Sequence, residues 1–93
     1  MVTLHHFTNP QWFLADGGWV SPRAVERFAR YVRRVVAALG ETVRYWVTIN
    51  EPMVYVRMHY VQGLGPPGVC DMRQALQVIR HLLEAHAVAY RLL

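Results

Sequence analysis

Apolar residues recur along this chain with two different spacings, one typical of strands and one typical of helices. Val2 to Phe7 and Val43 to Ile49 are short runs rich in β-branched and aromatic residues, which indicates two strands. After Ser21, and again after Asp71, apolar residues recur every three or four positions, which indicates two amphipathic helices. The pattern therefore predicts four main elements in the order β-α-β-α.

The first predicted helix has a start signal and a stop signal. Ser21 and Pro22 are typical of an N-cap followed by the first helical residue, and Gly40 is typical of a helix end. The apolar stripe between them consists of Val25, Phe28, Val32, Val35, Val36 and Leu39. A group of arginines shares this segment, and we interpret it as the solvated face of the helix: Arg23, Arg27, Arg30, Arg33 and Arg34.

The second predicted helix begins at Asp71, which matches a capping box with Gln74. One face of this long helix is marked by Leu76, Ile79, Leu83, His86 and Tyr90. The long connection between the two strands, which holds the first helix, implies a parallel sheet with right-handed crossovers.

Glycines and prolines predict the remaining segments. Thr8 to Val20 is expected to be irregular, with Asn9-Pro10 and Gly17-Gly18 as breakers. Pro52 to Tyr60 is expected to hold a short helix, and residues 63–68 to form a loop.

Two strand–helix units are too few to cover both faces of a parallel sheet. A closed eight-stranded barrel takes about 250 residues, so if this is barrel sequence, most of the barrel is missing.

Composition narrows the function classes. The chain has 93 residues, is 54% hydrophobic and 17% charged, and carries a formal charge of +4. All its basic residues are arginines, and no aromatic-interleaved basic motif supports nucleic-acid binding. No run approaches the roughly 20 apolar residues of a membrane span, and no signal peptide is visible. A single cysteine, Cys70, excludes an intrachain disulfide and favours a reducing compartment, which predicts a cytoplasmic protein.

Asn50-Glu51-Pro52 is the sharpest candidate for chemistry. It places an amide and a carboxyl at the end of a nearly apolar strand, and parallel α/β folds bind ligands at that edge. We expect Glu51 to be partly desolvated, so that it holds a proton near neutral pH and can protonate a leaving oxygen. Two structural alternatives remain: Glu51 as a favourable charge at a helix start, and Asn50 as a turn former.

Histidines and aromatic residues are the other candidates. His5 and His6 point to opposite faces of a strand, so they do not share a metal ion, and one of them is expected in the core and the other at the strand mouth. His81 and His86 lack the spacing of a helical metal pair, so we interpret them as packing residues. Five aromatic residues either stack on sugars or fill the core: Phe7, Trp12, Phe13, Trp19 and Trp46. Cys70 has no base beside it in sequence, which argues against a nucleophile.

Five motifs in order resemble those of the family-1 glycoside hydrolases, the β-glucosidase and β-glycosidase type. The block from Gly40 to Pro52 is similar to the family's G-(D/E)-x-V-x-x-W-x-T-x-N-E-P element, which is highly specific. The other four motifs are Val2 to Phe7, Asp16 to Trp19, Tyr60 to Gly63 with Pro66 to Gly68, and Ala85 to Ala87. The resemblance implies an α/β fold class, with residues 1–93 as a β-α-β-α piece of a (β/α)8 TIM barrel, about strand three to helix four. It implies no separate domains and a fold that is incomplete on its own.

The resemblance also implies roles for individual residues. Glu51 matches the general acid/base, and Asn50 matches the amide that binds the sugar hydroxyl next to the anomeric carbon. His6 matches the histidine that hydrogen-bonds the glycone, and Phe7 stands where the family often has tryptophan. A β-glycoside or oligosaccharide substrate is implied, with no cofactor and no metal. Residues 8–10, Thr-Asn-Pro, and Gly65 depart from common family residues, which leaves aglycone preference open.

A second catalytic carboxylate is missing from the chain. Retaining hydrolysis needs two carboxyl groups about 5–5.5 Å apart, and the family's Glu-Asn-Gly nucleophile motif does not occur in residues 1–93. We therefore expect a segment of a retaining β-glycosidase that is inactive by itself. The alternative is a non-catalytic remnant or interaction module that keeps the barrel motifs.

Overall fold

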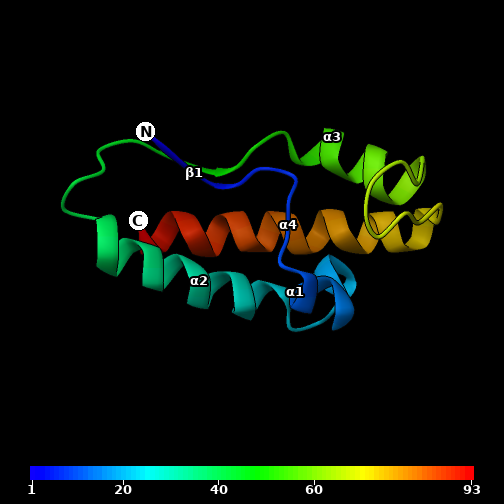
Figure 1. Ribbon diagram of the computed structural model, residues 1–93, viewed down its shortest axis with the longest axis horizontal. Coiled ribbons are helices and arrows are strands. Elements are labelled where there is room, and N and C mark those ends of the chain that lie inside the picture. Colours follow the sequence, from blue (N-terminus) through cyan, green and yellow to red (C-terminus); the bar gives the residue numbers. More distant parts are fainter.

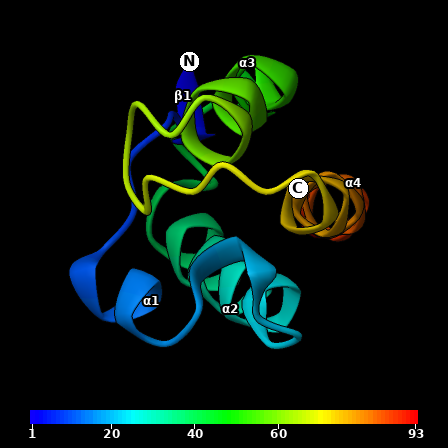
Figure 2. The same cartoon turned by 90° about the vertical axis from the view of Figure 1, so that its right-hand side faces the viewer.

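The computed structural model describes all residues, 1–93, and has the predicted β-α-β-α order with short additional turns. The elements are β1 (Val2–His5), α1 (Gln11–Ala15), the 3₁₀ turn η1 (Gly18–Val20), α2 (Ala24–Leu39), β2 (Trp46–Ile49), α3 (Pro52–Val56), the π-helical turn η2 (Arg57–Val61) and α4 (Met72–Leu92). In Figure 1 the two strands run along the top, α4 crosses the middle and α2 lies below it. Figure 2 shows the same arrangement end-on, with the strands and α3 above the two long helices.

The two strands pair in parallel, as the sequence predicts. Val2 lies opposite Trp46, and His5 lies opposite Ile49. Both strands are shorter than predicted, at four residues each. β1 ends before Phe7 because the backbone of Phe7 turns into the left-handed region, with φ of 69°. The carboxyl ends of β1 and β2 therefore lie side by side.

Helix α2 begins at Ala24, two residues later than Pro22 predicts. Ser21 still closes the first turn, because its Oγ accepts a hydrogen bond from the Arg23 N–H at 3.1 Å and its carbonyl accepts one from Ala24. Gly40 follows the last helical residue, as predicted. The buried face combines part of the predicted stripe with two alanines: Ala24, Phe28, Ala29 and Val32.

Helix α4 begins where Asp71 predicts, but it buries a different face. The Asp71 carboxylate accepts hydrogen bonds from the N–H groups of Arg73 at 2.9 Å and Gln74 at 3.2 Å. The buried residues are Ala75, Val78, Leu82, Ala85 and Ala89. The predicted face is offset from them, and its residues Leu76, Leu83 and Tyr90 are exposed. The physical reason is tertiary packing: α4 packs mainly against α2, and the position of α2 decides which stripe of α4 is covered.

The segment from Thr8 to Val20 is more ordered than the sequence predicts. Pro10 starts α1, since its carbonyl accepts hydrogen bonds from the N–H groups of Phe13 and Leu14. Phe13 and Trp19 from this segment are buried in the main core, where Trp19 is 1% exposed. The expectation of an irregular segment is therefore wrong for α1 and η1, which fasten the loop after β1 to the helices.

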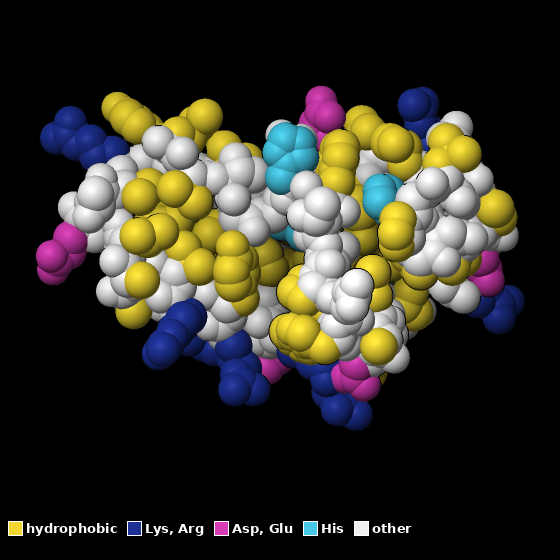
Figure 3. All heavy atoms as spheres, in the orientation of Figure 1, with side chains coloured by type: hydrophobic (Ala, Val, Ile, Leu, Met, Phe, Trp, Pro, Cys, Tyr) yellow, Lys and Arg dark blue, Asp and Glu magenta, His cyan; other side chains and the backbone are white.

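Charged residues lie on the surface, as the helix pattern predicts. Arg23, Arg30, Arg33 and Arg34 are exposed. In Figure 3 basic side chains project along the lower edge, over α2, while apolar side chains cover much of the same view. No helix of the structure has the length and apolar character needed to cross a membrane.

Candidate functional site at the carboxyl ends of the strands

The predicted site residues His6 and Asn50 come together at the ends of β1 and β2. The Asn50 backbone N–H donates to the His5 carbonyl at 2.9 Å, which extends the strand pairing by one residue. Beside it, the Asn50 side-chain amide nitrogen donates to His6 Nε2 at 3.2 Å. His6 is exposed and Asn50 is half-buried, so both side chains remain accessible to a ligand.

Glu51 follows directly and has an unusual backbone. Its φ of 41° and ψ of 61° lie in the left-handed region, which a residue with a side chain adopts at a cost. Its carbonyl accepts the Tyr55 N–H at 3.1 Å, so the strained residue is the N-cap of α3, which begins at Pro52. The Glu51 side chain is exposed. The desolvation that the sequence predicts for this carboxyl is therefore not provided by residues 1–93.

Phe7, another predicted site residue, lies next to His6. It is half-buried, packs against the core, and stacks on Tyr55 with ring centroids 6.1 Å apart and planes at 24°. The ring of His6 lies edge-on to Phe7 at 5.1 Å, and the ring of His59 lies 6.5 Å away. Left-handed residues therefore stand at both strand ends, Phe7 after β1 and Glu51 after β2. Such strain is often found at functional sites.

His5 is the core member of the histidine pair and His6 is the exposed one, in line with the prediction of one of each. His5 is 5% exposed and lies edge-on to the rings of Trp19 and Tyr55. Burial lowers the pKa of His5, an effect partly opposed by its hydrogen bond to Asn9. Burial likewise raises the pKa of the Tyr55 hydroxyl. Both side chains are therefore neutral near pH 7.

Two supporting residues were not singled out as site residues from the sequence. Asn9, predicted only as a breaker with Pro10 and as part of a departure from common family residues, hydrogen-bonds His5, Trp19 and Tyr55. His59, inside the predicted short helix, is buried and donates from Nδ1 to the Pro66 carbonyl at 2.6 Å. The asparagine beside a proline gave no signal beyond a turn. The bond from Asn9 to Tyr55 spans 46 positions and is not visible in the sequence, and His59 bonds Pro66 across the loop that follows η2.

The remaining candidates divide between the core and the surface of the chain. Trp19 and Phe13 are core, whereas Trp12 is 62% exposed, with the Arg27 guanidinium 5.8 Å from its ring centre. His81 donates from Nδ1 to the Trp19 carbonyl at 2.6 Å. Cys70 is free and exposed. No three His, Cys, Asp or Glu side chains gather closely enough to hold a metal ion.

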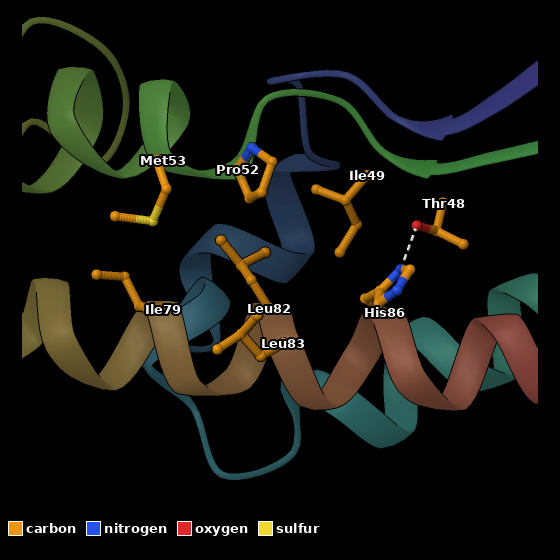
Figure 4. A pocket seen from close by; sticks show the side chains of 8 residues that line it. All are labelled: Thr48, Ile49, Pro52, Met53, Ile79, Leu82, Leu83 and His86. Carbon is orange, nitrogen blue, oxygen red and sulfur yellow. Dashed lines mark hydrogen bonds between the residues drawn. The ribbon is translucent and has the colours of Figure 1, made fainter.

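An apolar cleft of about 290 Å³ lies between β2, the start of α3, and α4. Figure 4 shows its lining residues, with Met53 and Ile79 at one end and the hydrogen bond between Thr48 Oγ1 and His86 Nδ1, at 2.7 Å, at the other. His6, Asn50 and Glu51 are not part of its lining. The polar site at the strand ends and this cleft are therefore separate features.

Comparison with known proteins gives one consistent result. The family described as Glycosyl hydrolase family 1 matches residues 1–93. Among solved structures, a β-glycosidase from Pyrococcus horikoshii is 43% identical, with a TM-score of 0.95 over 100% of this chain and 22% of its own. The β-glucosidase from Thermotoga maritima in complex with deoxynojirimycin is 33% identical, with a TM-score of 0.95 over 99% of this chain and 21% of its own. The human cytosolic β-glucosidase is 38% identical over 94% of this chain and 19% of its own length. The chain thus spans about a fifth of the length of the relatives it matches.

Proposed function

The chain belongs to glycosyl hydrolase family 1, and on that premise we propose that residues 1–93 form the acid/base part of a retaining β-glycosidase active site. In this proposal Glu51 protonates the leaving oxygen and later deprotonates water. Asn50 and His6 hold hydroxyl groups of the sugar, and Phe7 forms an apolar wall beside them. The chain is then a two-unit piece of a TIM barrel that depends on further units for its complete sheet.

The contact between His6 and Asn50 is the observation that carries this proposal. An amide and an imidazole 3.2 Å apart offer donors and acceptors to adjacent hydroxyl groups of one sugar ring. Glu51 follows Asn50 directly and is accessible, so a sugar held by that pair would have its glycosidic oxygen near a proton donor. The backbone strain at Glu51 and Phe7 supports a functional reading of the same edge.

The nucleophile has to come from outside these residues. Retaining hydrolysis needs a second carboxylate about 5–5.5 Å from the acid/base. The other acidic residues lie in turns, on helices or at the N-terminus of α4: Asp16, Glu26, Glu41, Asp71 and Glu84. Asp16 is already paired with Arg27. None of them stands at the end of a strand, so we propose that the other segments of a full-length enzyme supply the nucleophile.

The substrate class follows from the same site. Family-1 relatives are named β-glucosidase, β-galactosidase and β-glycosidase, which supports a β-glycoside or an oligosaccharide as substrate. Nothing in the site calls for a cofactor or a nucleic acid. Two relatives are named cytosolic, which supports the cytoplasm as the location proposed for this chain.

The missing carboxylate also supports a second candidate, a non-catalytic module that keeps the barrel motifs. An activity assay on two preparations separates the two. We expect the 93-residue chain alone to show no hydrolysis of an aryl β-glucoside, and a full-length family-1 enzyme that carries residues 1–93 to be active. Turnover by the isolated chain that is abolished by Glu51→Ala would contradict the missing nucleophile. A full-length enzyme whose activity is unchanged by Glu51→Ala would support the non-catalytic candidate.

A further inference from the structure

Asn9 makes three hydrogen bonds, all to groups on buried side chains. Its Oδ1 lies 3.1 Å from Trp19 Nε1 and 3.1 Å from His5 Nε2, and its Nδ2 lies 3.0 Å from the Tyr55 hydroxyl. Trp19 is 1% exposed and Tyr55 is fully buried. A half-buried loop residue therefore hydrogen-bonds one polar atom on each of three core rings, while the other ring nitrogen of His5, Nδ1, is buried without a hydrogen-bond partner.

The chemistry of these partners fixes the orientation of the amide. The Trp19 indole N–H can only donate, so the oxygen of Asn9 and not its nitrogen faces it. His5 Nε2 faces the same oxygen and therefore carries the proton, which makes the neutral Nε2–H tautomer the one present. The Asn9 nitrogen then donates to the Tyr55 hydroxyl. A side chain that lacked both a carbonyl and a donor would remove all three of these hydrogen bonds.

Two of the three partners, His5 and Tyr55, come from elements that adjoin the proposed site, and Trp19 comes from η1. His5 is the last residue of β1 and precedes His6, while Tyr55 lies one turn after Glu51 and donates its N–H to the Glu51 carbonyl. Asn9 thus links the end of β1 to α3, the helix that follows Glu51. The strained backbone of Phe7 lies between two anchored residues, His5 and Asn9.

We propose that Asn9 is a positioning residue that sets the placement of His6 and Phe7 relative to Asn50 and Glu51. This inference rests on the proposed function, because it assumes that those residues hold the sugar. Asn9 itself does not contact the substrate in this account. Replacing Asn9 should therefore weaken the binding of the sugar more than it slows the protonation of the leaving group.

The test uses a full-length family-1 enzyme that carries residues 1–93, with the sugar mimic deoxynojirimycin as the probe of glycone binding. Asn9→Leu, which has a similar size, should weaken deoxynojirimycin binding about tenfold, the equivalent of roughly one net hydrogen bond. The kcat per active site, measured with an aryl glucoside that has a good leaving group, should fall by a smaller factor than the deoxynojirimycin affinity. Asn9→Asp keeps an acceptor for both N–H groups and lets the Tyr55 hydroxyl donate, so it should restore part of the affinity. Thr8→Ala, an exposed neighbour outside the network, is the matched control and should change nothing.

Tyr55→Phe gives an independent test of the same network, because it removes only one hydroxyl group. Its affinity for deoxynojirimycin replaces that of Asn9→Leu if the Asn9→Leu variant fails to fold. Combined with Asn9→Leu, Tyr55→Phe should cost less than the sum of the two single losses, because both remove the same hydrogen bond. Unchanged affinity in Tyr55→Phe, and in Asn9→Leu where that folds, overturns the inference. His6→Ala separates this outcome from failure of the proposed function: if it too leaves affinity unchanged, the assignment of the sugar site is wrong, and not only the role of Asn9.

Discussion

Replacing Glu51 by glutamine in a full-length enzyme should remove proton transfer without disturbing the fold. The Glu51 side chain is exposed, and no hydrogen bond or ion pair joins it to other residues of the chain. Glutamine has the same shape, and as another residue with a side chain it experiences the same left-handed backbone strain at φ of 41°. The free energy of unfolding should therefore change by no more than about 0.5 kcal/mol, as for ordinary surface substitutions.

The rate loss should be much larger than that change in stability. General acid catalysis contributes roughly 10²–10⁴-fold, which corresponds to about 2.7–5.4 kcal/mol of activation free energy. Glycosylation of the enzyme should slow greatly for substrates with poor leaving groups and little for activated aryl glucosides, which need little protonation. Deglycosylation should slow for all substrates, because water then lacks a base, and added azide should restore part of that rate.

The assay compares aryl β-glucosides of graded leaving-group acidity, with and without azide, alongside a thermal unfolding curve. Glu41→Gln is the matched control, since Glu41 is also exposed and lies in the turn before β2. It should leave rates and unfolding unchanged. Equal rate losses for good and poor leaving groups without azide rescue, or a large fall in melting temperature, would show that Glu51 holds structure and not the proton.

Three further predictions concern the support of the site. Burial lowers the pKa of His5 below its ordinary value of 6.5, so the contribution of neutral His5 to stability should be complete above pH 6.5 and lost as pH falls toward the lowered folded pKa. Histidine NMR titration measures this pKa, and a value at or above 6.5 would contradict the burial argument. Gly65→Ala would put a methyl group 2.6 Å from His59 Nδ1 and displace the His59 ring from the Pro66 carbonyl. A denaturant titration should then show a loss of about 1–3 kcal/mol of unfolding free energy, and adding His59→Ala to the same chain should relieve the clash. Asp71→Ala should cost about 1 kcal/mol of unfolding free energy in the same titration, whereas Asp71→Asn should keep the cap of α4.

Local signals in the sequence predicted the order of the elements and several of their boundaries. Three predictions that depend on neighbouring residues or on element order are confirmed: the N-cap at Asp71, the end of α2 at Gly40 and the parallel pairing of the strands. The meeting of His6 and Asn50 follows from the same topology, because parallel strands bring their carboxyl ends to one edge.

Features that depend on packing between distant segments were not predictable in this way. The buried face of α4 is set by the position of α2, its main packing partner, and a period of 3.6 residues does not reveal which of two adjacent apolar stripes is covered. The cross-links of Asn9 join residues up to 46 positions apart. The exposure of Glu51 likewise depends on which other segments cover the strand ends, and an apolar strand before it carries no information about them.

A structure of a full-length enzyme carrying residues 1–93, with deoxynojirimycin bound, would test the central claim most directly. We expect the sugar mimic to lie over the ends of β1 and β2, with hydroxyl groups within hydrogen-bond distance of His6 and Asn50. The Glu51 carboxyl should face the position of the leaving oxygen, and a second carboxylate from outside these residues should stand about 5–5.5 Å from it. A mimic bound elsewhere, or a Glu51 side chain directed away from it, would contradict the assignment of this strand edge as the acid/base part of the active site.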